Sequence, residues 1–229
     1  MKKIRFYTEA AYILGLVLLA IGTAMMEKAN FGISMVVAPA YLVYLKLNPI
    51  LPAFTFGMAE YLLQLLLLAA LVVFRRKLHI SYVFSFITAF IYGQLLDGAM
   101  ALTAMFTAGS MLVRIILYLG GMAVCAAGIS MLFNTYITPE AYELIVKEIS
   151  AALNRPTRKV KTIYDLCSCA AAVLLSFLFF GFGVFEGVKL GTVFCALVNG
   201  TLIGLFSRLW KFKLDFTDAL KLRPLFEKK

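Results

Sequence analysis

The sequence has few charged residues. Only 15% of its 229 residues are charged, against about 25% in a typical soluble domain, while 62% are hydrophobic. A soluble domain of this size cannot bury so many apolar side chains in one core. The composition therefore excludes a soluble globular, fibrous or disordered protein and indicates a protein that is surrounded by lipid.

The chain also has few of the residues that build metal centres and disulfide frameworks. His79 is its only histidine, and no pair of its cysteines has Cys-x-x-Cys spacing. All four cysteines lie within apolar segments, where a thiol is typical as a small packing group: Cys125, Cys167, Cys169 and Cys195. We therefore expect no metal, no cofactor and no structural disulfide.

Motifs of common enzyme classes are missing. The sequence has no G-x-S-x-G, no H-E-x-x-H and no P-loop lysine motif. It also has no segment that resembles a soluble nucleotide-binding domain. We expect a protein that is not an enzyme and is not by itself an ATP-driven pump.

Long apolar runs make up most of the chain. Each has about the 20 residues that a helix needs to cross roughly 30 Å of hydrocarbon, and the runs are continuous, which favours helices over barrel strands. The six runs are approximately Ala10–Met26, Phe56–Phe74, Ser81–Met100, Met111–Phe133, Thr162–Gly181 and Leu190–Trp210. No cleavable signal peptide is expected, because the first run is itself long enough to span. The sequence thus predicts an all-α polytopic membrane protein, with residues 1–229 forming a single transmembrane domain.

The positive charge is concentrated in alternate connections between these runs. Of the 22 lysine and arginine residues, 18 lie in the segments that share a side with the N-terminus, and Arg114 lies within a span. Lys28, Lys46 and Lys189 are the three on the other side. This bias predicts that both termini are cytoplasmic. The net charge of +10 is then explained by contact with anionic lipid, and no nucleic acid partner is expected.

Two connections contain an apolar segment that is too short to span. Ser34–Lys46 has Pro39 inside it and is predicted to be either a re-entrant or an interfacial helix. Thr138–Leu153 is predicted to be a cytoplasmic amphipathic helix lying on the membrane or on the bundle. We expect Thr138 as its N-cap and Pro139 at its first position.

The second of these segments has a clear amphipathic pattern. Acidic residues, Glu140 and Glu143, stand near its positive dipole end. The predicted apolar stripe consists of Tyr142, Val146, Ile149 and Leu153. Residues 213–229 are predicted to be a basic cytoplasmic tail, held at headgroup depth by Trp210 and Phe212.

The two halves of the chain share an order of features, which indicates an internal repeat. Gly22 matches Gly128 at an offset of 106, and Glu60 matches Asp165 at an offset of 105. The predicted repeats cover about residues 8–104 and 108–212. Because each repeat has three spans, the second enters the membrane from the opposite side, as two inverted three-helix repeats do in many transporters.

Ionisable residues inside spans are costly and are therefore candidates for function. Glu60, Asp97 and Arg114 are all expected near the outer ends of their spans. One interpretation is a solute- or proton-handling site that opens to the outside. The other is a structural ion pair of Arg114 with Asp97 or Glu60 that fixes helix register.

Further polar residues complete the predicted site. Asp165 is expected to pair locally with Lys161 or Arg158, or to be the symmetry mate of Glu60. Asn199 is expected near mid-membrane, where helix packing is the simpler explanation. The candidate polar path or ligand site is Glu60, Asp97, Arg114, Asp165 and Asn199. Helix N-termini are expected at Ser34 and Thr138. The positive end of a helix dipole lies at its N-terminus, so these two ends could face an anionic ligand.

Several segments together resemble the YczE/YyaS/YitT-type bacterial integral membrane family, in a branch of unknown function. The usual Gly-x-Ser-Pro is Gly32-Ile33-Ser34-Met35 here, and its proline is present only in the second half, as Thr138-Pro139. The other matching segments are Gly57-Met58-Ala59-Glu60-Tyr61, Tyr92-Gly93-Gln94-Leu95-Leu96-Asp97 and Lys161-Thr162-Ile163-Tyr164-Asp165-Leu166. The resemblance implies a multi-pass protein of the bacterial cytoplasmic (inner) membrane. It supplies no substrate and no catalytic residue.

The leading hypothesis is a protein that moves or binds a small solute. The first alternative is a substrate-capture subunit of an energy-coupling-factor type importer, which resembles the chain in size and composition only. The second is a non-transporting membrane partner or regulator that acts through Thr138–Leu153 and the basic tail. The expected partners are the lipid bilayer and a small-molecule solute, with a homo-oligomer or a membrane partner protein left open.

Overall fold

The fold was analysed in a computed structural model that describes residues 3–76, 79–155, 157–220 and 222–226. Some of the basic residues counted above and part of the predicted tail, residues 221 and 227–229, lie outside these ranges, as does the side chain of Arg158.

Among the described residues, six helices are long and apolar enough to cross a membrane. They are α1 (Thr8–Ala29), α3 (Phe56–Arg75), α4 (Ile80–Ala104), α5 (Met111–Leu132), α7 (Thr157–Phe180) and α8 (Leu190–Lys213). Side chains cap two of them, because the hydroxyls of Thr55 and Ser110 accept N–H groups of the first turns of α3 and α5. The six predicted runs are confirmed as helices, and the chain is an all-α multi-pass membrane protein.

The remaining elements are short. They are β1 (Ile4–Tyr7), α2 (Ala38–Leu47), α6 (Ala141–Ala152), β2 (Leu214–Thr217) and α9 (Arg223–Phe226). The prediction that a helix begins at Ser34 was wrong by four residues. The Ser34 carbonyl instead accepts the N–H groups of Val37 and Ala38 in a turn, and α2 starts with Pro39 in its first turn.

The predicted start of α6 was also wrong. The carbonyls of Thr138 and Pro139 accept hydrogen bonds from the Thr88 and Ser85 hydroxyls of α4, at 3.0 and 2.8 Å. These bonds tie both residues to α4, and the helix begins only after Glu140, whose ψ is 160°.

The apolar stripe of α6 faces the bundle. Tyr142 and Val146 are buried, whereas Leu153 is 57% exposed and does not belong to the stripe. The helix packs against α3, α4 and α7. The sequence predicted that this helix lies either on the membrane or on the bundle, and in the structure α6 lies on the bundle.

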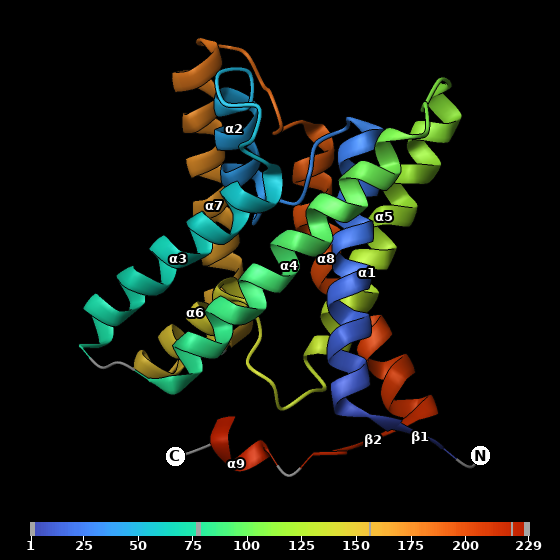
Figure 1. The fold of residues 1–229 in the computed structure, drawn as a ribbon, viewed down its shortest axis with the longest axis vertical. Helices are drawn as coiled ribbons and strands as arrows, with labels where there is room; N and C mark the ends of the chain where they lie inside the picture. Colours follow the sequence, from blue (N-terminus) through green and yellow to red (C-terminus); the bar gives the residue numbers. More distant parts are fainter. Residues whose placement is uncertain (1–2, 77–78, 156, 221, 227–229) are drawn as a thin grey trace.

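Helices α1 and α5 run side by side through the molecule (Figure 1) and make the most extensive helix contact among the described residues. Glycines allow this approach. A Cβ atom on Gly128 would lie 2.7 Å from the Gly15 carbonyl oxygen, and one on Gly121 would lie 2.8 Å from that of Gly22. Small residues of this kind let membrane helices cross at backbone contact.

The other helices pack around this pair. Helix α4 packs on α1 and α8 packs on α5, while α6 packs on α3 and α2 packs on α7. Helices α3 and α4 meet at Gly57 and Gly93, where a Cβ atom on Gly93 would lie 2.8 Å from the Gly57 carbonyl oxygen. Among the described residues, no comparable packing joins α7 to α8.

The outer surface of the bundle is apolar, as a protein in lipid requires. Leu178 of α7 and Leu197 of α8 are each 77% exposed. Such large exposed apolar patches are rare on soluble monomers.

Both described ends of the chain lie at the same end of the molecule (Figure 1), as six spans require. Strands β1 and β2 pair in parallel there, and the Glu9 carboxylate accepts the N–H groups of Ala219 and Leu220. Trp210 donates to Ser130 of α5, so its indole binds the bundle.

Candidate functional site

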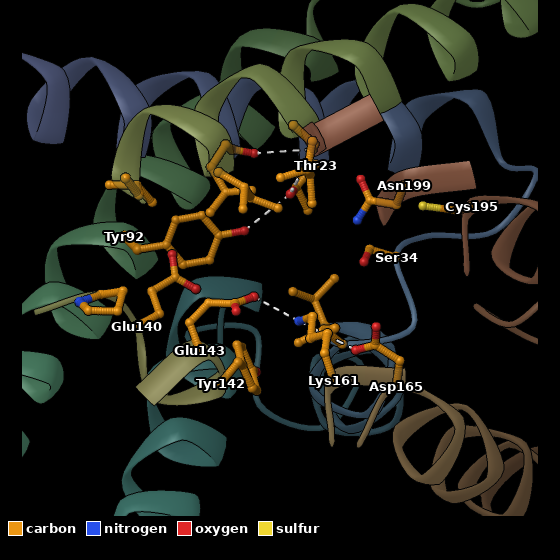
Figure 2. A pocket seen from close by; sticks show the side chains of 18 of the residues that line it. Thr23, Ser34, Tyr92, Glu140, Tyr142, Glu143, Lys161, Asp165, Cys195 and Asn199 are labelled. Atoms are coloured by element: carbon orange, nitrogen blue, oxygen red, sulfur yellow. Dashed lines mark hydrogen bonds and ion pairs between the residues drawn. The ribbon is translucent and has the colours of Figure 1, made fainter. Parts of the chain in front are cut away.

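A buried cavity lies where the chain segments that lead into α2 and α6 approach each other. Water centres can occupy about 60 Å³ of it. Its walls come from six helices and from the two segments around Ser34 and Pro139. The polar residues that line it are Thr23, Ser34, Tyr92, Glu140, Tyr142, Glu143, Lys161, Asp165 and Asn199 (Figure 2).

Gln64 of α3 holds the beginning of α6 beside this cavity. Its Oε1 accepts the backbone N–H of Ala141 at 3.0 Å. Its Nε2 lies 3.4 Å from Glu60 Oε1 and 3.5 Å from Glu140 Oε2. One amide group therefore bridges two carboxyl groups and fixes the first residue of a helix.

Both carboxyl groups are buried. Glu60 is completely inaccessible and Glu140 is 6% exposed. Burial raises the pKa of Glu140 to about 8, with the Glu143 carboxylate adding to the increase and Lys161 opposing it. The protonated form of Glu140 therefore predominates at pH 7.

Lys161 joins the other two acids of the cavity. Its Nζ lies 2.7 Å from Glu143 Oε1 and 3.4 Å from Asp165 Oδ1. Figure 2 shows this row of three side chains along one wall, with the Glu140 carboxyl group and the Tyr92 ring farther along. The lysine charge is thus shared between two carboxylates.

Two buried acceptor atoms on the cavity wall have no hydrogen-bond partner among the described residues. They are Glu140 Oε1 and Asn199 Oδ1. The Tyr142 hydroxyl interacts with the Glu60 carboxyl group, and Asp165 Oδ1 lies 3.4 Å from Lys161 Nζ. Since buried polar groups are normally paired, this concentration marks a place that suits a polar ligand.

The predicted polar path is only partly assembled here. Asp165, Asn199 and Ser34 line the cavity, and Asp165 pairs with Lys161 as predicted. Glu60 does not line the cavity, and its Oε1 lies 3.4 Å from Gln64 Nε2. Thr138 lies next to the lining residue Pro139, with its carbonyl bonded to α4.

Asp97 caps a helix instead of joining the cavity. Its Oδ2 accepts the Thr55 hydroxyl at 2.6 Å, and its Oδ1 accepts the Gly57 N–H at 2.8 Å. The carboxylate thus binds the N-terminus of α3, where the helix dipole favours a negative charge.

Arg114 does not form the expected ion pair with Asp97 or Glu60. Its Nε donates to the Ala29 carbonyl at 2.8 Å, and its guanidinium group lies over the Phe31 ring at 4.9 Å. Arg114 therefore binds the C-terminal end of α1, where the last carbonyls accept hydrogen bonds.

The sequence interpretation missed six polar members of the site, of which Thr23 and Tyr92 were given no role in it. Glu140 and Glu143 were assigned only to the helix start, Lys161 only to a local pair, and Tyr142 only to an apolar stripe. The available signal was the run Pro139-Glu140-Ala141-Tyr142-Glu143, since two acids beside a proline at a helix start are costly to bury without a function.

Comparison with known families identifies the chain. A model of DUF6198, a family of unknown function, matches residues 6–208, so the chain belongs to this family. No curated protein and no solved structure gave a significant match. The narrower resemblance to the YczE/YyaS/YitT-type family stays a prediction.

Proposed function

We propose that this member of the DUF6198 family is a small-solute carrier of the bacterial cytoplasmic membrane, with the cavity as its binding site. One observation carries the proposal. The segments that lead into two non-spanning helices meet at a buried cavity whose walls hold unpaired polar atoms. In transporters, solutes commonly bind where broken helices meet between two halves of the protein.

The contacts between α1 and α5 support two inverted repeats. Gly15 meets Gly128, and Gly22 meets Gly121. An offset of 106 residues converts Gly15 to Gly121 and Gly22 to Gly128, so it converts one contact into the other. A self-complementary contact of this kind is what a two-fold axis between the halves produces.

Most of the remaining helix pairs among the described residues follow the same relation, although the packing of α4 with α6 has no comparable counterpart between α8 and α2. The pairing of α1 with α4 corresponds to that of α5 with α8, and the pairing of α2 with α7 corresponds to that of α6 with α3. The close contact of α3 with α4 has no counterpart between α7 and α8 among the described residues. In a carrier that alternates between two states, the two halves are expected to differ in this way.

The amphipathic helix gives no support to a regulator. The apolar face of α6 is buried against the chain's own helices, so it is not available to a partner protein. No feature of the described structure specifically favours a substrate-capture subunit of an importer. The transport experiment below distinguishes this alternative from a carrier.

The test is counterflow in liposomes that contain only this protein. Vesicles are loaded with one unlabelled amine, amino acid, sugar or carboxylate, and entry of the same labelled compound is followed. We expect counterflow for at least one class. Binding without counterflow in any class would favour a capture subunit, and neither binding nor counterflow would contradict a solute-binding role.

A cross-linking experiment tests whether α3 moves relative to α4 during transport. The rings of Tyr61 in α3 and Phe90 in α4 lie 5.6 Å apart. With Cys167 and Cys169 replaced by serine, we expect that a short thiol cross-linker between Tyr61→Cys and Phe90→Cys abolishes counterflow. The two single-cysteine proteins treated with the same reagent are the controls. Undiminished counterflow in the cross-linked protein would contradict movement of α3 against α4.

A further inference from the structure

We propose that the cavity binds a small organic cation with a primary ammonium group, and that the Glu140 carboxylate is its main counter-charge. This inference rests on the proposed function for the position of the site and adds the chemical class of the solute.

The first argument is the kind of atom that lacks a partner. The unpaired atoms on the cavity wall are Glu140 Oε1 and Asn199 Oδ1, and Figure 2 shows Glu140 and Asn199 on opposite sides of the space. A carboxylate oxygen and an amide oxygen only accept hydrogen bonds. An ammonium group offers three donors and no acceptor, so it complements this wall.

The second argument is charge. Glu140, Glu143 and Asp165 line the cavity, and Lys161 is the only lysine or arginine among its described lining residues. Lys161 already lies between Glu143 and Asp165. Glu60 adds a further acid behind the wall. The fully ionised site would therefore lack positive charge, and a cationic ligand supplies it.

The helix starts do not make this an anion site. The Ala141 N–H at the start of α6 is bonded to Gln64. At the start of α2, the N–H groups of Val37 and Ala38 are bonded to the Ser34 carbonyl. An anion would also have to approach three carboxyl groups, whose repulsion opposes binding.

A bare metal ion fits less well than an ammonium ion. Calcium takes six to eight oxygen ligands and magnesium an octahedral set. No group of three or more aspartate, glutamate, histidine or cysteine side chains that could hold a metal ion occurs among the described residues.

The size and lining of the cavity limit the ligand. Its space of about 60 Å³ for water centres exceeds the 10–15 Å³ or so that one water needs, which suits a short alkylamine. The Tyr92 ring lies beside Glu140 in Figure 2, and an aromatic face attracts a cation.

Binding is then linked to pH through Glu140. Its pKa of about 8 means that a cation displaces a proton at pH 7. Ionisable groups from every neighbouring helix interact with this carboxyl group or line the same cavity. They are Tyr12 of α1, Glu60 of α3, Tyr92 of α4, Cys125 of α5, Tyr142 and Glu143 of α6, and Lys161 and Asp165 of α7. In the absence of ligand, burial and the Glu143 carboxylate favour the protonated acid, while Lys161 and the hydrogen bond from Gln64 oppose it.

The test uses the full chain in detergent with ethylamine, butylamine, tetramethylammonium, acetamide and acetate as probes. We expect that ethylamine or butylamine raises the midpoint of thermal unfolding, while acetamide and acetate do not. Tetramethylammonium has charge but no N–H donor and is expected to bind at least tenfold more weakly than butylamine. Wild-type protein should release close to one proton per bound amine at pH 7 in weakly buffered solution.

Variants locate the site. Glu140→Gln should weaken butylamine binding at least tenfold. Glu148→Gln is the matched control, because Glu148 lies in α6, the helix that follows Glu140, but pairs with Arg75 and does not line the cavity. The proton release of the wild-type protein keeps the test valid if Glu140→Gln folds poorly.

The outcomes separate the two proposals. Stabilisation by acetate or acetamide but not by amines would overturn the cation assignment and leave a solute-binding cavity. Amine binding that Glu140→Gln does not weaken, or that releases no proton, would overturn the role of Glu140. Amine binding without counterflow of any solute would support the site and contradict the carrier.

Discussion

The side-chain oxygen of Gln64 accepts the backbone N–H of Ala141 at 3.0 Å, so a residue inside a spanning helix fixes the first turn of a non-spanning one. Replacing Gln64 by leucine leaves this buried N–H without a partner and removes the donor shared by Glu60 and Glu140. An unsatisfied buried group costs about 1–3 kcal/mol. We expect Gln64→Leu to lower the free energy of unfolding by that amount, measured by thermal denaturation in detergent.

Gln94→Leu is the matched control, because Gln94 is an exposed residue of the adjacent spanning helix α4. The same substitution there should have little effect. Equal losses of stability in the two variants would show that the Gln64 bridge is unimportant.

The pH dependence of stability should change when Glu140 is neutralised. Its carboxyl pKa rises from about 4.5 in the unfolded chain to about 8 in the fold, so the folded state binds more protons between these values. Stability from this group is complete below pH 4.5 and is lost as the pH rises towards 8, by at most about 1.4 kcal/mol per unit. Glu140→Gln should therefore gain stability relative to wild type between pH 5 and 8. A constant difference between the two proteins over this range would contradict the raised pKa.

Asp97 is expected to be a structural residue. Asp97→Ala removes the two hydrogen bonds to Thr55 and Gly57 and should destabilise the protein by about 0.5–2 kcal/mol, as the loss of a helix cap does. Ligand affinity should stay within about twofold. Asp215→Ala, at an exposed position of β2, serves as the control in the same unfolding assay. A variant that folds normally but loses counterflow would place Asp97 on the solute path after all.

The α1–α5 contact should not tolerate a side chain. A Cβ atom on Gly128 would lie 2.7 Å from the Gly15 carbonyl oxygen, and overpacking of this kind costs about 1–3 kcal/mol. We expect Gly128→Val to lower the unfolding midpoint clearly. At Gly204 a Cβ atom would meet nothing within 4 Å, so Gly204→Val should be tolerated, and similar midpoints for both variants would refute the close crossing.

The orientation predicted from the charge distribution can be measured with reporter fusions. Green fluorescent protein fused after Lys229 should fluoresce, because it folds only in the cytoplasm, whereas a fusion after Gly109 should not. Alkaline phosphatase at the same positions should give the opposite result. A fluorescent fusion at Gly109 together with a dark one at Lys229 would reverse the assigned orientation.

The sequence was sufficient for the membrane class and for all six spans, because each span must satisfy its own backbone hydrogen bonds in hydrocarbon and must be continuously apolar over about 20 residues. Those requirements are local. The start of α6 was misplaced because it depends on contacts with a distant part of the chain. Residues Thr138 and Pro139 match a helix start by local preference, yet their carbonyls bind hydroxyls of α4, some 50 residues earlier in the chain.

The candidate site, too, was predictable from the sequence only in part. The free-energy cost of placing a charged side chain inside a membrane was enough to select Glu60, Asp97, Arg114 and Asp165 as candidate functional residues, since any charge in a span needs an explanation. The sequence by itself thus determined that this is a polytopic membrane protein and which spans carry charge. Only the tertiary structure decided that Asp97 and Arg114 bind helix ends while Glu140 and Lys161 line a cavity, because the partners of a buried charge come from helices distant in the chain.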